Sequence, residues 1–293
     1  MRDFGPKGVQ FFYVYKALAH PEHNGYVQPF TLEERLLHVK VAERTLGSEI
    51  PWICDSMKNE VKHALGDAPN SEFLIDPDGR VLRRVAWSSP SKLRTLLGKL
   101  VGPVENPTSV ADLNLKVEPP PKVAARGVVP RLARPSGLQP LIIEPQVEEG
   151  ARPFYAKLRA EADSGLLRSG SGTLYVGFHM DPIYHVHWNN LRKPVRVEFE
   201  GLPEDGEAGA RVDPAVWTGP DPEEPVDIDP REFLAKVSVP DGVKTLSLKV
   251  SYFACNDEAG WCVPLTQRYT IRLQSDRDGG RARGGRPGGR PRR

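Results

Sequence analysis

Cysteine and long apolar runs are both scarce in this sequence. The chain of 293 residues has three cysteines, Cys54, Cys255 and Cys262, which are too few for a disulfide-rich scaffold. No apolar stretch approaches the ~18 residues that cross a bilayer as a helix, so no membrane span is expected. The segment after Arg2 and Lys7 ends in a cleavage-like Ala-Leu-Ala, but its polar and Tyr residues favour a strand over a signal peptide.

An excess of charge of one sign is also nearly absent. The chain carries +2 at neutral pH, and residues 276–293 alone contribute seven Arg and two Asp, so the remainder is mildly acidic. A nucleic-acid-binding face needs clustered Lys and Arg, so none is expected on the folded parts. The Arg/Gly-rich tail, residues 275–293, lacks the Phe or Tyr that would stack on bases, and we expect it to be a disordered, solvated terminus.

Length and composition predict two domains. A typical domain has ~150 residues, and this chain has 293. The Pro-rich segment 102–137, which contains Pro119–Pro121, predicts an extended linker. The expected division is a first domain over 1–101, this linker, a second domain over 138–274 and the tail.

The first domain has the pattern of a mixed α/β fold. Gly8–Tyr15 is rich in β-branched and aromatic residues without alternation, which predicts a strand buried on both faces. Thr31 and Glu34 form a capping box that starts a helix ending at Gly47. Four further elements are expected: a strand Ile50–Cys54, a helix Ser56–Leu65, a hairpin of Ser71–Asp76 with Arg80–Ala86, and a helix Ser89–Leu100.

Short motifs spread over residues 8–101 resemble the iodothyronine deiodinase branch of the thioredoxin superfamily. They are Phe12–Tyr15, Ala19–Pro21, Asn24–Tyr26, Thr31–Arg35, Ile50–Pro51, Asp55–Met57 and Pro69 before a strand. The resemblance implies a thioredoxin-like domain, in which His20 matches the catalytic-loop histidine. It also implies that Ala68–Pro69 is a cis peptide bond beside the redox site.

The family's nucleophile has no counterpart here. The reactive selenocysteine or cysteine of that family lies upstream of the strand matching Gly8–Tyr15, at a helix N-terminus that stabilises the thiolate. Residues 1–7 contain no Cys, so we expect either a start placed too late or a domain without its nucleophile. A loop histidine bonded to backbone is the equal alternative for His20, and Cys54, in an apolar strand, is expected to be a buried, inert thiol.

The second domain is predicted to be an antiparallel sandwich of immunoglobulin-like kind. Its seven expected strands are Leu141–Ile143, Gly172–His179, Tyr184–Trp188, Val195–Phe199, Phe233–Val239, Leu246–Phe253 and Tyr269–Leu273. One helix, roughly Phe154–Leu167, is expected to interrupt them.

Cys255 and Cys262 are the candidate for chemistry. Six residues separate them, and a loop of this length can bring two Cα atoms within the ~5.5 Å that a disulfide needs. A structural staple and an exchanging pair both fit this spacing.

The same stretch resembles the N-terminal immunoglobulin-like domain of the thiol:disulfide interchange protein DsbD. Tyr252, Cys255, Cys262 and Pro264 match its Tyr-x-x-Cys and Cys-x-Pro pattern, with six residues between the cysteines where that family usually has five. The resemblance implies that the pair is reactive. Three rings are expected to flank the loop and shield the sulfurs: Tyr252, Phe253 and Trp261.

Three histidines lie close together in the sequence of the second domain, before the two cysteines. His185 and His187 would project to one face of a strand, a spacing that can chelate copper or zinc, and His179 is a further candidate. A third certain ligand is lacking, so a polar sheet face is favoured and neither a metal nor another cofactor is expected.

Three functions are compatible with these features. The first is thiol–disulfide exchange through Cys255 and Cys262 with a thioredoxin-like or other disulfide-exchange partner, and it leaves open whether the chain is an enzyme. The second is a non-catalytic binding module with a structural disulfide, and the third is a deiodinase-like reductive dehalogenase that would use His20. The DsbD resemblance implies a bacterial protein outside the cytoplasm, either periplasmic or secreted.

Overall fold

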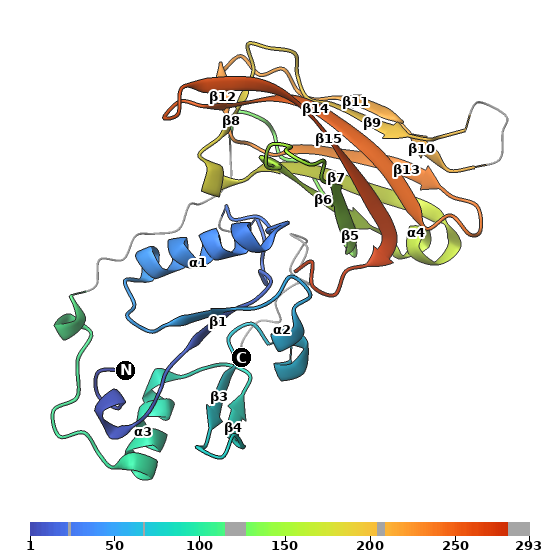
Figure 1. The fold of residues 1–293 in the computed structure, drawn as a ribbon. Helices are drawn as coiled ribbons and strands as arrows, with labels where there is room; N and C mark the ends of the chain where they lie inside the picture. Colours follow the sequence, from blue (N-terminus) through green and yellow to red (C-terminus); the bar gives the residue numbers. More distant parts are fainter. Residues whose placement is uncertain (23–24, 67, 115–126, 204–208, 281–293) are drawn as a thin grey trace, which may run out of the picture. The chain divides into compact units, whose positions relative to one another are not determined.

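The computed structural model describes residues 1–22, 25–66, 68–114, 127–203 and 209–280. The chain divides into two units, Met1–Ala17 with Pro29–Pro119 and Leu18–Gln28 with Pro120–Arg293. Residues 115–126 of the expected linker and 281–293 of the expected tail lie outside the described residues. The first unit mixes helices with short strands, whereas the second is mostly β (Figure 1).

The first unit alternates short strands with helices before it ends in a hairpin and a helix. Its elements are η1 (Gly5–Lys7), β1 (Tyr13–Tyr15), α1 (Leu32–Leu46), β2 (Trp52–Cys54), α2 (Glu60–Leu65), β3 (Glu72–Ile75), β4 (Val81–Val85), α3 (Pro90–Val101) and η2 (Ala111–Leu113). β1 pairs with β2 in parallel and β3 pairs with β4 antiparallel, as two separate two-stranded sheets. The hairpin expected between residues 71 and 86 is confirmed.

Helix α1 begins and ends where the sequence predicts. The Thr31 hydroxyl accepts a hydrogen bond from the Glu34 N–H at 3.2 Å, which satisfies one of the free donors of the first turn. At the other end Gly47 adopts a left-handed conformation with φ 57°, which glycine tolerates without a Cβ clash. Within the helix the buried Arg35 donates to the carbonyls of Asp55 and Ser56, so α1 is tied to the loop before α2.

Three expectations for the first unit are wrong. Strand β1 covers only Tyr13–Tyr15 and Tyr13 is exposed, because β2 is its only strand neighbour among the described residues. Ser56 does not cap α2, since the Asp55 carboxylate accepts from the backbone N–H groups of residues 61 and 62 and the helix starts at Glu60. Ala68–Pro69 is not cis; the cis X-Pro bond of the described residues is Asp213–Pro214.

The second unit is built from eleven strands, one short α-helix and one 3₁₀ helix among its described residues. They are β5 (Gln139–Gln146), β6 (Ala156–Ala162), α4 (Ser164–Ser169), β7 (Ser171–Met180), η3 (Pro182–Tyr184), β8 (His187–Asn189), β9 (Arg196–Glu200), β10 (Arg211–Asp213), β11 (Val216–Thr218), β12 (Val226–Asp227), β13 (Arg231–Ser238), β14 (Thr245–Asn256) and β15 (Trp261–Ser275). The strand order is β10-β13-β7-β6-β5-β15-β14-β8-β12, and β9 joins β14 to β11.

Strand β5 connects two layers of this sheet. Its first residues pair with β6 and its later residues pair with β15, so the chain passes from one layer to the other within β5 (Figure 1). Side chains from the two layers meet between them. Phe178 of β7 lies edge-on to Tyr269 of β15, and Phe233 of β13 stacks on Trp217 of β11 at 5.1 Å. Burial of these rings supplies the apolar core of the unit.

The outer side of the β6, β7 and β13 layer carries buried charges that are paired. Arg134 binds Glu161 at 3.3 Å and Glu232 at 3.1 Å, and Arg131 binds Glu232 at 2.7 Å. The hydroxyl of Tyr175 also donates to Glu232. Pairing is required here because an isolated buried charge is strongly unfavourable.

Two expectations for the second unit are corrected. The expected helix over Phe154–Leu167 is strand β6 followed by the short α4, because residues 156–162 pair along β7. The expected strand Tyr184–Trp188 is a 3₁₀ turn that ends at Tyr184, followed by His185 at φ 53° and β8 from His187 onward.

Candidate redox site

A long hairpin carries the candidate site at its tip. Strands β14 and β15 pair from Thr245 opposite Arg272 to Asn256 opposite Trp261. The turn between them is closed by the Asn256 side chain, which accepts a hydrogen bond from the Ala259 N–H at 2.7 Å. Directly before this turn, Cys255 lies opposite Cys262, and the two form a disulfide bond.

The two cysteines differ in their access to solvent. Cys255 is only 4% exposed, whereas Cys262 on the returning strand is exposed. Strand β8 pairs with β14 so that His187 lies opposite Cys255, while the other side of β15 at this position has no paired strand among the described residues. Strand pairing thus covers one cysteine and leaves the other open to an incoming reagent.

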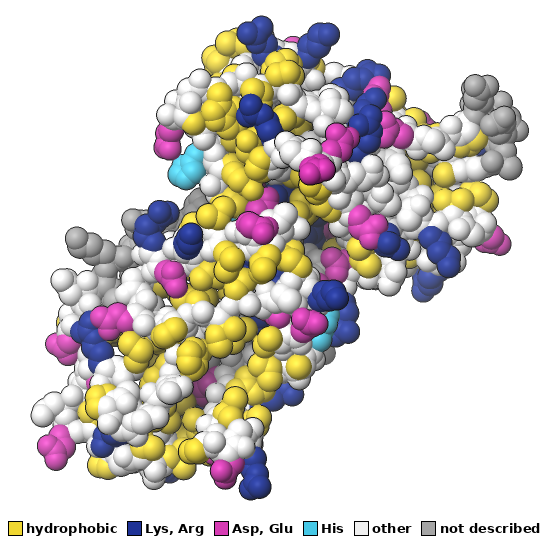
Figure 2. Space-filling model, viewed as in Figure 1, with side chains coloured by type: hydrophobic (Ala, Val, Ile, Leu, Met, Phe, Trp, Pro, Cys, Tyr) yellow, Lys and Arg dark blue, Asp and Glu magenta, His cyan; other side chains and the backbone are white. Residues whose placement is uncertain are grey.

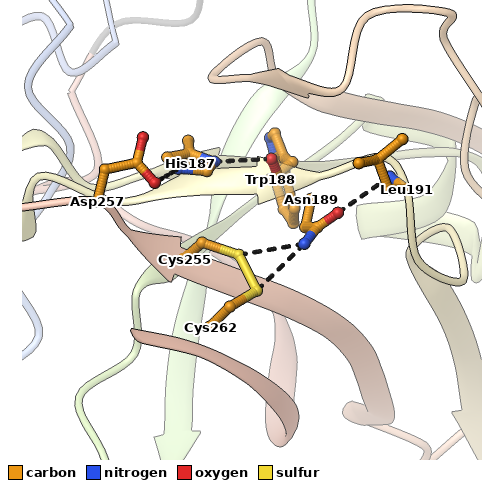
Figure 3. The surroundings of a disulfide bond; sticks show 7 residues. All are labelled: His187, Trp188, Asn189, Leu191, Cys255, Asp257 and Cys262. Carbon is orange, nitrogen blue, oxygen red and sulfur yellow. Dashed lines mark hydrogen bonds and ion pairs between the residues drawn. A yellow bond between two sulfur atoms is a disulfide. The ribbon is translucent and has the colours of Figure 1, made fainter. Parts of the chain in front are cut away.

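Asn189 of β8 contacts both sulfurs (Figure 3). Its Nδ2 lies 3.2 Å from Sγ of Cys262 and 3.5 Å from Sγ of Cys255. Its Oδ1 accepts a hydrogen bond from the Leu191 N–H at 3.0 Å. A backbone N–H requires an acceptor, so this bond fixes the carboxamide with its NH₂ group toward the sulfurs.

His187 lies on the same face of the sheet, two residues before Asn189 on β8. Its Nδ1 is 2.9 Å from the Trp188 carbonyl oxygen and its Nε2 is 3.1 Å from Oδ1 of Asp257 in the hairpin turn. A second pair joins the exposed His185 and Glu258 at 3.8 Å. The contact between His187 and Asp257 holds the hairpin turn beside β8 (Figure 3).

Two of the three rings expected to shield the sulfurs lie elsewhere. Side chains alternate along a strand, so Tyr252 and Cys255 project to opposite faces, and the Tyr252 hydroxyl donates to the buried Gln267. Burial raises the pKa of Tyr252. Trp261 packs against Tyr155 with ring centroids 5.2 Å apart. Phe253 shares the face of Cys255 and lies opposite Pro264.

The remaining predicted site residues, His20, Pro69 and Cys54, belong to segments other than the hairpin. His20 is exposed in the loop 18–28, and Pro69 is exposed in a turn before β3. Cys54 on β2 is half-buried rather than buried, its Sγ lies 3.6 Å from the Asp55 carbonyl oxygen, and burial raises the pKa of its thiol. A raised thiol pKa lowers the fraction of reactive thiolate.

The three histidines named as metal candidates are in different settings. His179 is buried on β7, where burial lowers its pKa well below the usual value. His185 and His187 pair with carboxylates of the hairpin turn. No group of three or more His, Cys, Asp or Glu in the described part of the chain is arranged to hold a metal ion.

Surface charge and helix length bear on charged partners and on membrane spans. On the face shown in Figure 2, acidic and basic side chains are interspersed. None of the helices in the described ranges combines the length and apolarity needed to cross a membrane.

Asn189 was not found from the sequence. It lies 66 residues before Cys255, and nothing in the local Trp-Asn-Asn sequence marks it. Only the pairing of β8 with β14 brings it to the sulfurs.

The fold and site therefore define a mostly β protein with a solvent-accessible disulfide at a hairpin tip. Searches of protein-family models, of curated proteins and of solved structures find no match to this chain.

Proposed function

We propose that the chain is a thiol–disulfide exchange protein whose Cys255–Cys262 pair accepts electrons from a dithiol partner. The observation that carries the proposal is the unequal exposure of the two cysteines, with Cys262 exposed and Cys255 buried. Exchange requires a thiolate to approach one sulfur along the S–S axis, and an exposed Cys262 permits this approach.

The position of the disulfide argues against a purely structural role. In the chain-entropy view a disulfide stabilises a fold by restricting the unfolded chain, and the effect grows with the length of the closed loop. The loop from Cys255 to Cys262 is short, and its ends are already held opposite each other by strand pairing. Such a loop gives roughly 2–3 kcal/mol, near the low end of the usual range.

The exchange would proceed in two balanced steps. The partner's thiolate attacks Sγ of Cys262, a mixed disulfide forms, and the electron pair of the broken S–S bond leaves on Cys255. A second thiol of the partner then loses its proton and attacks the partner's own sulfur in the mixed disulfide, which releases Cys262. The partner ends as a disulfide, and this chain gains two electrons and two protons.

The same proposal extends to the family resemblances. The all-β unit with its Tyr-x-x-Cys and Cys-x-Pro hairpin would be an immunoglobulin-like domain of the DsbD type, and the protein would then act outside the cytoplasm. The order of elements β1 to α3 supports a thioredoxin-like first unit of the deiodinase type. A dehalogenase would need its own nucleophile, and Cys54 with its raised thiol pKa does not favour that activity.

A free-thiol assay tests the proposal on the full chain. We expect a mild dithiol reagent to reduce the pair, seen as two new alkylated cysteines by mass spectrometry, while the circular dichroism of the β unit is retained. Cys255→Ser should then trap a mixed disulfide through Cys262. If reduction occurs only together with unfolding and neither single variant traps a partner, the disulfide is a staple and the chain is a binding module.

A further inference from the structure

We propose that Asn189 is a catalytic residue of the exchange, because its amide group stabilises the thiolate that leaves on Cys255. This inference rests on the proposed function and adds to it a residue that no cysteine motif identifies. It concerns the step in which the S–S bond breaks and negative charge appears on Sγ of Cys255, a residue that is only 4% exposed.

A buried thiolate needs a donor. Removing a charged group from water is unfavourable unless hydrogen bonds replace those of the solvent. Burial therefore raises the pKa of a cysteine thiol, because it disfavours the charged thiolate. Within the described residues, the side-chain donor recorded at Sγ of Cys255 is Nδ2 of Asn189, at 3.5 Å. A hydrogen bond to a charged acceptor is roughly twice as strong as one to a neutral acceptor, so this contact strengthens as the charge forms.

The orientation of the donor is fixed before the reaction. Oδ1 of Asn189 is held by the Leu191 N–H at 3.0 Å, which keeps the NH₂ group toward the sulfurs in the oxidised protein (Figure 3). The NH₂ group has two hydrogens and reaches both sulfurs, at 3.2 Å and 3.5 Å. Donors that are already in place where charge develops stabilise a transition state without reorganisation.

The leaving sulfur gains most from this contact. In disulfide exchange, a leaving thiol with a lower pKa departs faster. Asn189 therefore accelerates attack on Cys262 by lowering the pKa of Cys255, and its loss should slow exchange even with a small reagent that makes no protein–protein contact.

Two variants and one control test this role. Asn189→Ala removes the donor, and Asn189→Asp keeps the shape but places a carboxylate beside the leaving thiolate. Leu191→Asp adds the same charge two residues further along the chain, at a residue that is 75% exposed, while keeping the backbone N–H. Each full-length protein is reduced with dithiothreitol at neutral pH and high salt, and the rate is followed by alkylation and mass spectrometry.

We expect Asn189→Ala to be reduced about tenfold more slowly than wild type and Asn189→Asp more slowly still, since one hydrogen bond to a charged group has about this effect. Leu191→Asp should change the rate less than about twofold, because salt screens exposed charges. In the reduced Asn189→Ala protein, the ultraviolet thiolate absorbance should appear at higher pH, by about one unit.

The outcomes separate the two proposals. If wild type is reduced readily while both Asn189 variants, folded by circular dichroism, are reduced at the wild-type rate, the role of Asn189 is wrong and the exchange function stands. If wild type is reduced only when it unfolds, the exchange function fails and the role of Asn189 fails with it.

Discussion

The two units of this chain hold their cysteines in contrasting ways. Cys54 lies on a three-residue strand of a two-stranded sheet, half-buried and with a raised thiol pKa. Cys255 and Cys262 lie on the longest hairpin of the described residues, where Cys255 is buried beside β8 and Cys262 is exposed.

Under the proposed function, this contrast explains how a sheet would make a disulfide reactive. Pairing places the two cysteines opposite each other, so the site is built on strands rather than on a loop. The same pairing delivers Asn189 from a distant part of the sequence. Cys54, by contrast, is a free, half-buried thiol whose Sγ lies 3.6 Å from the Asp55 carbonyl oxygen.

The largest expected effect separates the cysteines themselves. Cys262→Ser should abolish exchange with a dithiol partner, because the exposed sulfur that receives the attack is gone, whereas Cys54→Ser should leave the exchange rate within about twofold of wild type. Stopped-flow reduction of the purified variants measures both. Loss of exchange in Cys54→Ser would contradict the proposal that only the cysteines of the second unit carry the reaction.

A second expected effect concerns the packing that supports each site. Phe178 is fully buried between the layers of the second unit, whereas Leu82 on β4 is more than half exposed. Phe178→Ala should cost about 3–5 kcal/mol of unfolding free energy, and Leu82→Ala should stay within about 0.5 kcal/mol. Urea denaturation followed by hydrogen exchange of β7 and β4 would locate each change in its unit. Equal costs would mean that the two units are packed alike.

Local sequence signals predict elements better than they predict pairing. The capping residues of α1 and the turn of the β3–β4 hairpin are local, and both are confirmed. Strand β6 was missed because Ala, Lys, Leu, Arg and Glu favour helices, while its pairing with β7 overrides that preference. The segment does alternate, since Lys157, Arg159 and Glu161 share one face. Both of its faces are buried. The charged residues therefore do not identify a solvent-exposed face, as they would in a strand on the surface.

The buried charges of the second unit predict that its stability decreases at acidic pH. Burial alone would raise the pKa of Glu232, but hydrogen bonds from Arg131 and Tyr175 outweigh it and lower the pKa to about 2 from 4.5. Because the folded pKa is the lower one, this stabilisation is complete above about pH 4.5 and is lost as the pH falls toward 2. The loss should be on the order of 3 kcal/mol.

Unfolding followed by circular dichroism at a series of acidic pH values measures this loss of stability. Glu232→Gln should be less stable than wild type at neutral pH and should lose less stability between pH 4.5 and 2, because Gln does not titrate there. Glu144→Gln is a suitable control, since Glu144 pairs with Arg272 on the exposed surface. If Glu232→Gln loses as much stability as wild type between pH 4.5 and 2, a group other than Glu232 is responsible for the loss.

The smallest expected effect asks whether surface charge contributes to the reactivity of the hairpin. Asp257 binds His187 at 3.1 Å, but its carboxylate is 83% exposed, and exposed ion pairs contribute about 0–1 kcal/mol. Asp257→Asn should therefore change the rate of reduction by dithiothreitol less than about threefold. Glu258→Gln, which removes the more distant pair with His185, should change it still less. A tenfold effect of Asp257→Asn would show that the charge of the turn sets the reactivity of Cys262, and the contrast between the units would then be electrostatic rather than a consequence of strand pairing.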